Sequence, residues 1–226
     1  MDGILIIDKP RGMTSHDVID FVRRSFSIKK AGHAGTLDPS ATGVLVVLIG
    51  KATKLSSHFL SADKEYEAVM TLGRKTHTGD ADGRVLQERS AGGVTEDSIR
   101  SVFASFEGET EQVPPMVSAI HHKGRRLYEL ARKGEEVHRE PRRINIMELK
   151  INRIVLPEIG FTVKCSKGTY IRKLCDDIGD RLGCGAHLSS LRRIRAGDFA
   201  VGDSVGLEQL KSYSAEDLER RLLKHE

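Results

Sequence analysis

Apolar positions along the chain repeat at two intervals, and the interval changes from one segment to the next. Apolar runs at 3–7 and 44–49 predict strands, and the second run is apolar throughout, as in a strand buried on both faces. Residues 66–72 alternate between apolar and polar or small side chains, which predicts a half-buried strand. Helical spacing of apolar residues predicts helices at about 15–26, 51–60, 96–106, 127–133 and 171–182.

The other apolar segments complete a mixed pattern. They predict strands at 117–121 and 188–194, and a hairpin formed by 142–156 and 159–165. Strands and helices therefore intermix without a regular βαβ alternation, so we predict an α+β fold in which helices flank a mixed sheet. Residues 85–115 are acidic, and we expect them to form a peripheral insertion.

Composition excludes several classes of protein. The longest strictly apolar run is Val44 to Ile49, whereas a membrane-spanning helix needs about 20 apolar residues. The chain starts without basic residues, so we expect no secretory signal. Three cysteines at spacings of ten and nine fit neither a disulfide framework nor a zinc site. We therefore expect reduced thiols and a cytoplasmic protein.

The net charge of +4 is unevenly distributed along the 226 residues. Residues 121–153 hold ten Lys and Arg against five Asp and Glu, and residues 164–195 hold eight against three. Two explanations of these blocks are equally open. They are an ordinary solvated surface, or basic segments that converge in space on a polyanion. Tryptophan is absent and aromatic residues make up 5%, so a broad base-stacking platform is not expected.

The candidate for catalysis lies in a loop. Residues 31–43 contain three glycines and a proline, which predicts an ordered loop and not a helix or regular strand. An aspartate before proline, such as Asp38, is most often a turn residue. The loop is long, contains His33 and precedes a wholly apolar strand, so Asp38 is also a candidate nucleophile or general base.

A second candidate is Arg172, at the start of the helix expected at 171–182. A cation at a helix N-terminus is unfavourable, so this arginine either has a carboxylate partner or points to solvent. The Asp-rich turn at 80–83 lacks the spacing of a calcium loop, and the pair His121-His122 lacks further ligands, so we expect no metal.

A set of short motifs is spread in order along the chain. The motifs are 3–15 (GILIIDKPRGMTS), 32–45 (GHAGTLDPSATGVL), 64–66 (KEY), 76–83 (THTGDADG), 114–119 (PPMVSA) with 124–132 (GRRLYELAR), 168–172 (GTYIR) and 187–193 (HLSSLRR). Together they resemble the TruB family of tRNA pseudouridine synthases. The resemblance implies an isomerase that flips out a T-loop uridine (position 55 in tRNA numbering), detaches the base, rotates it and rejoins it through C5. No cofactor is implied.

The resemblance also implies roles for individual residues. Asp38 is the essential nucleophile, and Arg172 is its partner. Tyr66 acts at the reacting centre by stacking on the uracil, and His33 enters the space near the flipped nucleotide. The other substrate contacts that the resemblance implies are Tyr170 and, as an apolar wall of the pocket, Leu191.

The family resemblance covers 1–195 as the catalytic domain. Most members continue into an RNA-binding domain of the PUA type, whereas here 196–226 form a short acidic extension with two short helices expected, so that domain is absent or vestigial. The implied partner is the T-arm of tRNA, with no membrane, no required protein partner and a monomeric state. The residues expected to contact the RNA backbone are Lys123, Arg125, Arg126, Arg142 and Arg143.

Two other functions remain open from the sequence. A guide-RNA-dependent pseudouridylase of the dyskerin type shares the Asp-containing loop, but that class relies on its PUA domain and on protein partners. A noncatalytic tRNA-binding chaperone is expected to lack Asp38 or Arg172, and both are present.

Overall fold

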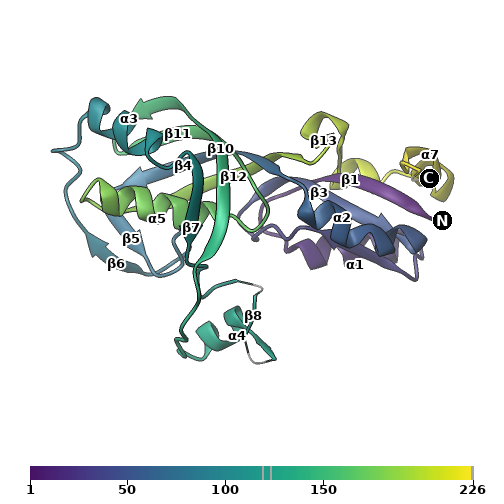
Figure 1. Ribbon diagram of the computed structural model, residues 1–226. Helices are drawn as coiled ribbons and strands as arrows, with labels where there is room; N and C mark the ends of the chain where they lie inside the picture. The colour runs from purple at the N-terminus through teal and green to yellow at the C-terminus, as the bar shows by residue number, and fades with distance from the viewer. Residues whose placement is uncertain (119, 123, 225–226) are drawn as a thin grey trace. The chain divides into compact units, whose positions relative to one another are not determined.

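The computed structural model describes residues 1–118, 120–122 and 124–224, and it confirms the α+β class (Figure 1). The chain forms two compact units. The first consists of Met1–Glu67 and Leu191–Glu226, and the second is the continuous segment Ala68–Ser190. The division falls within two strands, β4 (Lys64–Leu72) and β12 (Ala186–Ala196).

The first unit is organised around one buried strand. β3 (Thr42–Ile49) is the predicted apolar run, and its residues from Gly43 onward are buried. β3 pairs antiparallel with β1 (Gly3–Lys9) and parallel with β12 at Arg192 and Arg193. The shorter strands of this unit are β2 (Ala31–Ala34), β13 (Phe199–Ala200) and β14 (Val205–Gly206).

Helices flank this sheet, and two of them, α1 and α7, begin at side-chain caps. Thr14 caps α1 (Ser15–Ser25) by accepting a hydrogen bond from the backbone of Asp17, whose side chain in turn accepts one from the backbone of Thr14. The helix predicted at 51–60 is a short 3₁₀ helix followed by an α-helix. The other helical segments of the unit are η1 (Gly50–Leu55), α2 (Ser56–Ser61), η2 (Val201–Asp203), α6 (Leu207–Leu210) and α7 (Ala215–Arg221).

The loop predicted at 31–43 is shorter than expected, because its first four residues form β2. Ala31–Ala34 pairs antiparallel with β3 from Val46 to Ile49, so backbone pairing outweighs the poor strand propensity of glycine. The irregular loop begins at Gly35, whose φ of +100° is in the left-handed region that glycine tolerates.

The C-terminal segment belongs to the core of the first unit. The two short helices predicted there form as α6 and α7, and their leucines are buried. Leu210 and Leu218 are fully buried in the same apolar cluster as Leu5 of β1 and Val18 of α1. Residues beyond 204 therefore complete the core of the unit that carries Asp38.

The second unit contains the predicted long hairpin. β10 (Arg142–Val155) and β11 (Glu158–Cys165) pair antiparallel, β7 (Gly108–Gln112) lies beside β10, and β4 lies beside β11. Smaller strand pairs and helices complete the unit: β5 (Arg74–Thr76), β6 (Val85–Glu88), α3 (Glu96–Ala104), β8 (His121–His122), β9 (Arg125–Arg126), α4 (Leu127–Arg132) and α5 (Ile171–Arg181).

One sequence prediction differs in part from the structure of this unit. The strand predicted at 117–121 does not form at 117 and 118, because Ser118 donates a backbone hydrogen bond to Met116 and closes a turn there, whereas His121 begins β8. The segment 85–115 contributes to the unit through β7, which pairs with β10, and through α3, which buries Phe103. Among the described residues, no helix is long and apolar enough to cross a membrane.

Burial of the C-terminal leucines leads to a first prediction. Leu218 is 0% exposed, so the Leu218→Ala variant should lose about 2–5 kcal/mol of unfolding free energy, because it leaves a cavity in the core. Urea denaturation measures the loss. Glu219→Ala is the control variant, because Glu219 is the exposed neighbour of Leu218 and its loss should change the unfolding free energy little. Equal stability of the two variants would contradict this account of the C-terminal segment.

Candidate active site

The loop that carries Asp38 is held by backbone contacts on both sides of the aspartate. The amide of Ala41 donates to the carbonyl of Asp38 at 3.1 Å, and the amide of Gly12 donates to the carbonyl of Pro39 at 2.8 Å. Leu37 and Ala41 are buried on either side of Asp38. The turn that bears the carboxylate is therefore built into the unit and is not a free surface loop.

Ser15 fixes the loop from the first residue of α1. Its hydroxyl accepts a hydrogen bond from the amide of Leu37 at 2.9 Å and donates to the carbonyl of Leu37 at 3.2 Å. Ser15 is 2% exposed, so both backbone groups of Leu37 are satisfied away from water. The sequence placed Ser15 only at the end of the family motif 3–15 and gave no sign of this contact.

Lys9, at the end of β1, supports the loop from beneath. Its Nζ donates to the carbonyls of Pro10 at 2.9 Å, Met13 at 2.7 Å and Pro39 at 3.3 Å. An ammonium has three donors, so the protonated side chain satisfies all three carbonyls. Burial lowers the pKa of Lys9 to about 8, and the negative charge of Asp38 opposes that shift.

His33 lies in β2, on the same unit as Asp38. Burial, and next the positive charge of Arg193, hold the pKa of the His33 imidazole below its usual value. Its Nδ1 is buried and has no hydrogen-bond partner among the described residues. A neutral imidazole with an unused polar atom is suited to contact a substrate.

The same unit contains Tyr66 and Leu191. Tyr66 lies in β4 and is 9% exposed, and Leu191 lies half-buried in β12. Tyr170 and Arg172 belong to the second unit.

Arg172, in the first turn of α5, is 4% exposed, so it does not point to solvent. Its Nη1 donates to the carbonyl of Thr78 at 2.9 Å, and its Nη2 donates to the carbonyl of Val117 at 2.8 Å. Nη1 also lies 3.6 Å from a carboxylate oxygen of Asp80. These acceptors offset the unfavourable position of a cation at a helix N-terminus.

Asp80 is a residue of this site that the sequence reasoning missed. Its carboxylate accepts hydrogen bonds from the hydroxyl of Thr78 at 2.6 Å and from the amide of Asp82 at 3.2 Å. The turn is thereby closed with its carboxylate toward Arg172. The available signal was the Asp-rich turn at 80–83, which the sequence analysis tested as a calcium site and included in a family motif without a role for Asp80.

Tyr170 immediately precedes α5 and is fixed through its backbone. Its amide donates to Oε1 of Gln112 at 2.8 Å, and its carbonyl accepts from Nε2 of Gln112 at 3.2 Å. Gln112 is 5% exposed and belongs to β7. These two hydrogen bonds fix the backbone of Tyr170 and therefore the start of α5, where Arg172 lies.

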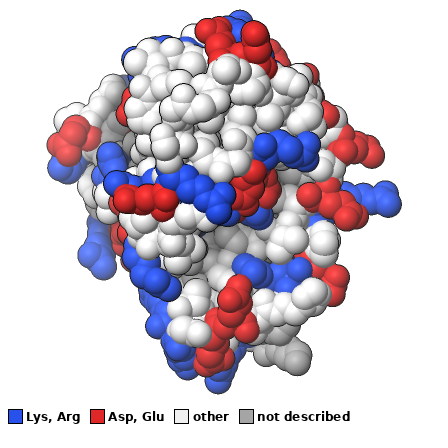
Figure 2. Space-filling model, turned by 90° about the vertical axis from the view of Figure 1, so that its left-hand side faces the viewer, with Lys and Arg blue, Asp and Glu red and all other residues white. Residues whose placement is uncertain are grey.

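The residues expected to contact an RNA backbone are exposed where the structure describes them. Arg125 and Arg126 form β9, and Arg142 and Arg143 begin β10, while Lys123 lies outside the described residues. On the face shown in Figure 2, Lys and Arg side chains lie beside Asp and Glu side chains. The positive charge is therefore not a uniform patch on that face.

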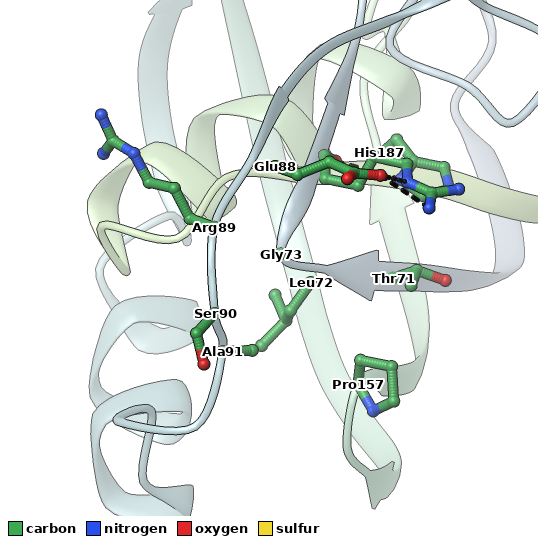
Figure 3. Close-up of a pocket in the computed structure, with 10 residues that line it drawn as sticks. Thr71, Leu72, Gly73, Glu88, Arg89, Ser90, Ala91, Pro157 and His187 are labelled. Carbon is green, nitrogen blue, oxygen red and sulfur yellow. Dashed lines mark hydrogen bonds and ion pairs between the residues drawn. The ribbon is translucent and has the colours of Figure 1, made fainter.

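One large cavity of the second unit is lined by none of the residues expected at the site. It has a volume of about 620 Å³ and is shown in Figure 3. Thr71, Leu72, Pro157 and His187 are among its lining residues. A smaller cavity of about 270 Å³ is lined by Arg172, and the chemistry of this side chain makes it the better candidate. Within the described residues, no group of three or more metal-ligating side chains occurs.

Comparisons with known proteins show which family this chain is similar to. Residues 23–171 match the TruB family pseudouridylate synthase N-terminal domain, and residues 172–225 match the tRNA pseudouridylate synthase B C-terminal domain. The tRNA pseudouridine synthase B of Opitutus terrae is 47% identical and covers 99% of this chain and 92% of its own length. That of Syntrophotalea carbinolica is 48% identical over 99% of this chain and 73% of its own length.

Solved structures are similar as well. A chain from a Cbf5-Nop10-Gar1 complex has a TM-score of 0.74 and 36% identity, and covers 93% of this chain. A chain from an H/ACA RNP bound to a substrate RNA with 2′-deoxyuridine has a TM-score of 0.72 and 31% identity, and covers 98% of this chain. This chain spans about half the length of each, 54% and 56%.

The lowered pKa of Lys9 leads to a prediction about pH. Between pH 8 and about 10.5 the unfolded chain keeps the Lys9 proton while the folded chain releases it, so this residue adds stability as pH rises through that window. The unfolding free energy of the wild type minus that of Lys9→Met should therefore increase from pH 8 to pH 10 in urea titrations. A constant difference would show that Lys9 keeps an ordinary pKa in the fold.

Proposed function

The chain belongs to the TruB family of pseudouridylate synthases, and we propose that it isomerises the T-loop uridine of tRNA to pseudouridine with Asp38 as nucleophile. The family match extends over residues 23–225, and the curated relatives carry the activity in their names. The structural observation that supports Asp38 is its loop, which Ser15 and Lys9 hold by hydrogen bonds to Leu37 and Pro39.

The reaction needs an ionised carboxylate. The bond between ribose C1′ and uracil N1 breaks, the base rotates, and a bond between C1′ and C5 forms, while C5 loses a proton and N1 gains one. A nucleophilic carboxylate splits this exchange into two easier steps. The ammonium of Lys9 donates to the carbonyl of Pro39, and the negative charge of Asp38 acts on the pKa of Lys9, so a positive charge lies near the proposed nucleophile.

The other proposed contacts keep the detached base in place. Tyr66 and Leu191 provide a ring and an apolar wall, which exclude water while the base is free to rotate. His33 contacts the flipped nucleotide in its neutral form, which is consistent with its lowered pKa and the unused Nδ1. Extrusion of the base costs a few kcal/mol, which contacts to the T-arm must offset.

We assign Arg172 as the partner of Asp38 and Tyr170 as a second contact to the substrate. The two residues are held by independent hydrogen bonds, so their positions do not depend on the presence of RNA. Arg172 donates to Thr78 and Val117, and the backbone of Tyr170 is bound by Gln112. Preorganised charge of this kind is the largest single source of catalysis in many enzymes.

We further propose that the protein acts on tRNA in the cytoplasm, as a monomer and without a protein partner. Its three cysteines are buried thiols that form no disulfide with one another, which is consistent with a reducing compartment. Arg125, Arg126, Arg142 and Arg143 are exposed and available to neutralise phosphates.

The similarity to Cbf5 supports a second candidate, a guide-RNA-dependent pseudouridylase. Incubation of the purified protein with an unmodified tRNA transcript distinguishes the two. Pseudouridine in the T-loop without added guide RNA or protein supports the first proposal. Its formation only after such additions would support the second.

Asp38→Asn should abolish isomerisation and leave tRNA binding nearly unchanged, because the substitution keeps the size of the side chain but removes the nucleophile. Tritium release from tRNA labelled at uracil C5 measures turnover, and filter binding measures affinity. Asp97→Asn, an exposed substitution in the first turn of α3, is the matched control. Turnover of Asp38→Asn near that of the control would remove Asp38 from its assigned role.

An isolated T-arm stem-loop should compete for the protein nearly as well as whole tRNA, because the proposed contacts lie on the T-arm. Competition at one fixed salt concentration measures the ratio of affinities. If whole tRNA binds more than about a hundredfold tighter, ~2.8 kcal/mol of binding comes from outside the T-arm. Residues 196–226 would then have to be tested as a further RNA contact.

A further inference from the structure

Arg193 is a buried cation beside the loop of Asp38. It lies in β12, it is 1% exposed, and it is among the largest fully buried side chains of the chain. A buried guanidinium is costly unless its donors are hydrogen-bonded. The sequence analysis included it only in a family motif and gave it no role.

The Arg193 guanidinium contacts both ends of the loop that carries Asp38. Its Nε donates to the carbonyl of Val44 at 2.7 Å, and its Nη2 donates to the carbonyl of Gly35 at 3.0 Å. Gly35 is the first residue after β2, and Val44 is the third residue of β3. One rigid planar group therefore joins the segment that enters the loop to the segment that leaves it.

Both ends of the loop are shaped around this arginine. A Cβ at Gly35 would lie 3.4 Å from Nη1 of Arg193, and a Cβ at Gly43 would lie 2.2 Å from the Arg193 carbonyl oxygen. Gly43 also pairs with Arg193 in the parallel register of β3 and β12. The close approach of the backbone at Gly43 is therefore possible only without a side chain.

We propose that Arg193 is a positioning residue, which sets the location of the Asp38 carboxylate by fixing the distance between the two ends of its loop. The inference rests on the proposed function, because it assigns Asp38 the nucleophilic role. Asp38 lies three residues after Gly35 and six residues before Val44, so a change in either anchor moves it. The charge of Arg193 also reaches this region, since it contributes to the lowered pKa values of His33 and Lys9.

Lysine cannot replace this group. An ammonium at the end of a flexible chain lacks the planar fork with which Arg193 donates in two directions. In Arg193→Lys the loop should lose one anchor while a positive charge remains. Displacement of a nucleophile by about 1 Å costs on the order of a hundredfold in rate.

The first experiment measures the single-turnover rate of pseudouridine formation at saturating tRNA, together with the Kd for tRNA. Arg193→Lys should lower the rate by about a hundredfold and leave the Kd within about twofold. Arg195→Lys is the matched control, because Arg195 lies on the same strand, is exposed and has its charge near Glu65. A rate for Arg193→Lys equal to that of the control would overturn the proposal.

A second variant separates positioning from a general loss of structure. Arg193→Ala leaves a space shaped for a guanidinium, so added guanidinium ion at non-denaturing concentration should restore part of the rate. The same addition should not restore Asp38→Asn. Absence of rescue in an Arg193→Ala protein that is folded by circular dichroism would contradict the proposal.

Hydrogen exchange tests, without any assay of activity, whether Arg193 holds the two ends of the Asp38 loop together, a contact that we call the clamp. Peptides that cover residues 35–43 should exchange faster in Arg193→Lys than in the wild type, while peptides from α7 should be unchanged. Equal exchange in the loop would overturn the clamp. If the wild type makes no pseudouridine but the loop responds in this way, the proposed function fails and the clamp stands.

Discussion

Positive charge buried beneath the Asp38 loop is the constraint on which the first unit depends. Lys9 and Arg193 are 0% and 1% exposed, and their donors need acceptors that water cannot provide. The loop provides them as carbonyls of Gly35, Pro39 and Val44. The conformation of the loop is therefore determined by the buried cations as much as by its own glycines, and its aspartate is placed among positive charges.

Much of this fold is predictable from the sequence, because its strongest signals are local. The apolar run that forms β3, the long hairpin and the cap of α1 each depend on neighbouring residues. The functions of Lys9 and Asp80 were not predictable from the residues alone, because their partners are distant in sequence or lie within a turn that has other uses. Arg193 illustrates the limit, since its contact with Val44 joins residues 149 positions apart.

The structure distinguishes arginines that look alike in the sequence. Arg172 is held by carbonyls and a carboxylate in the second unit, whereas Arg193 is held by carbonyls at both ends of a loop in the first. Arg192, next to it, is half-buried and forms an ion pair with Asp8 at 2.7 Å. A count of basic residues treats Arg172, Arg192 and Arg193 alike. Only exposed arginines, however, are available to bind phosphate.

The contacts of the C-terminal segment also determine when the first unit can form during synthesis. β1 pairs with Val205 and Gly206, and Ile4 forms a bridge with Leu223. One edge of β1 can pair with β3 early, whereas its other edge waits for partners made about two hundred residues later. The second unit, which is continuous in sequence, has no such delay. A nascent chain thus lacks one strand partner of β1 and the buried leucines Leu210 and Leu218 until the C-terminal segment has emerged.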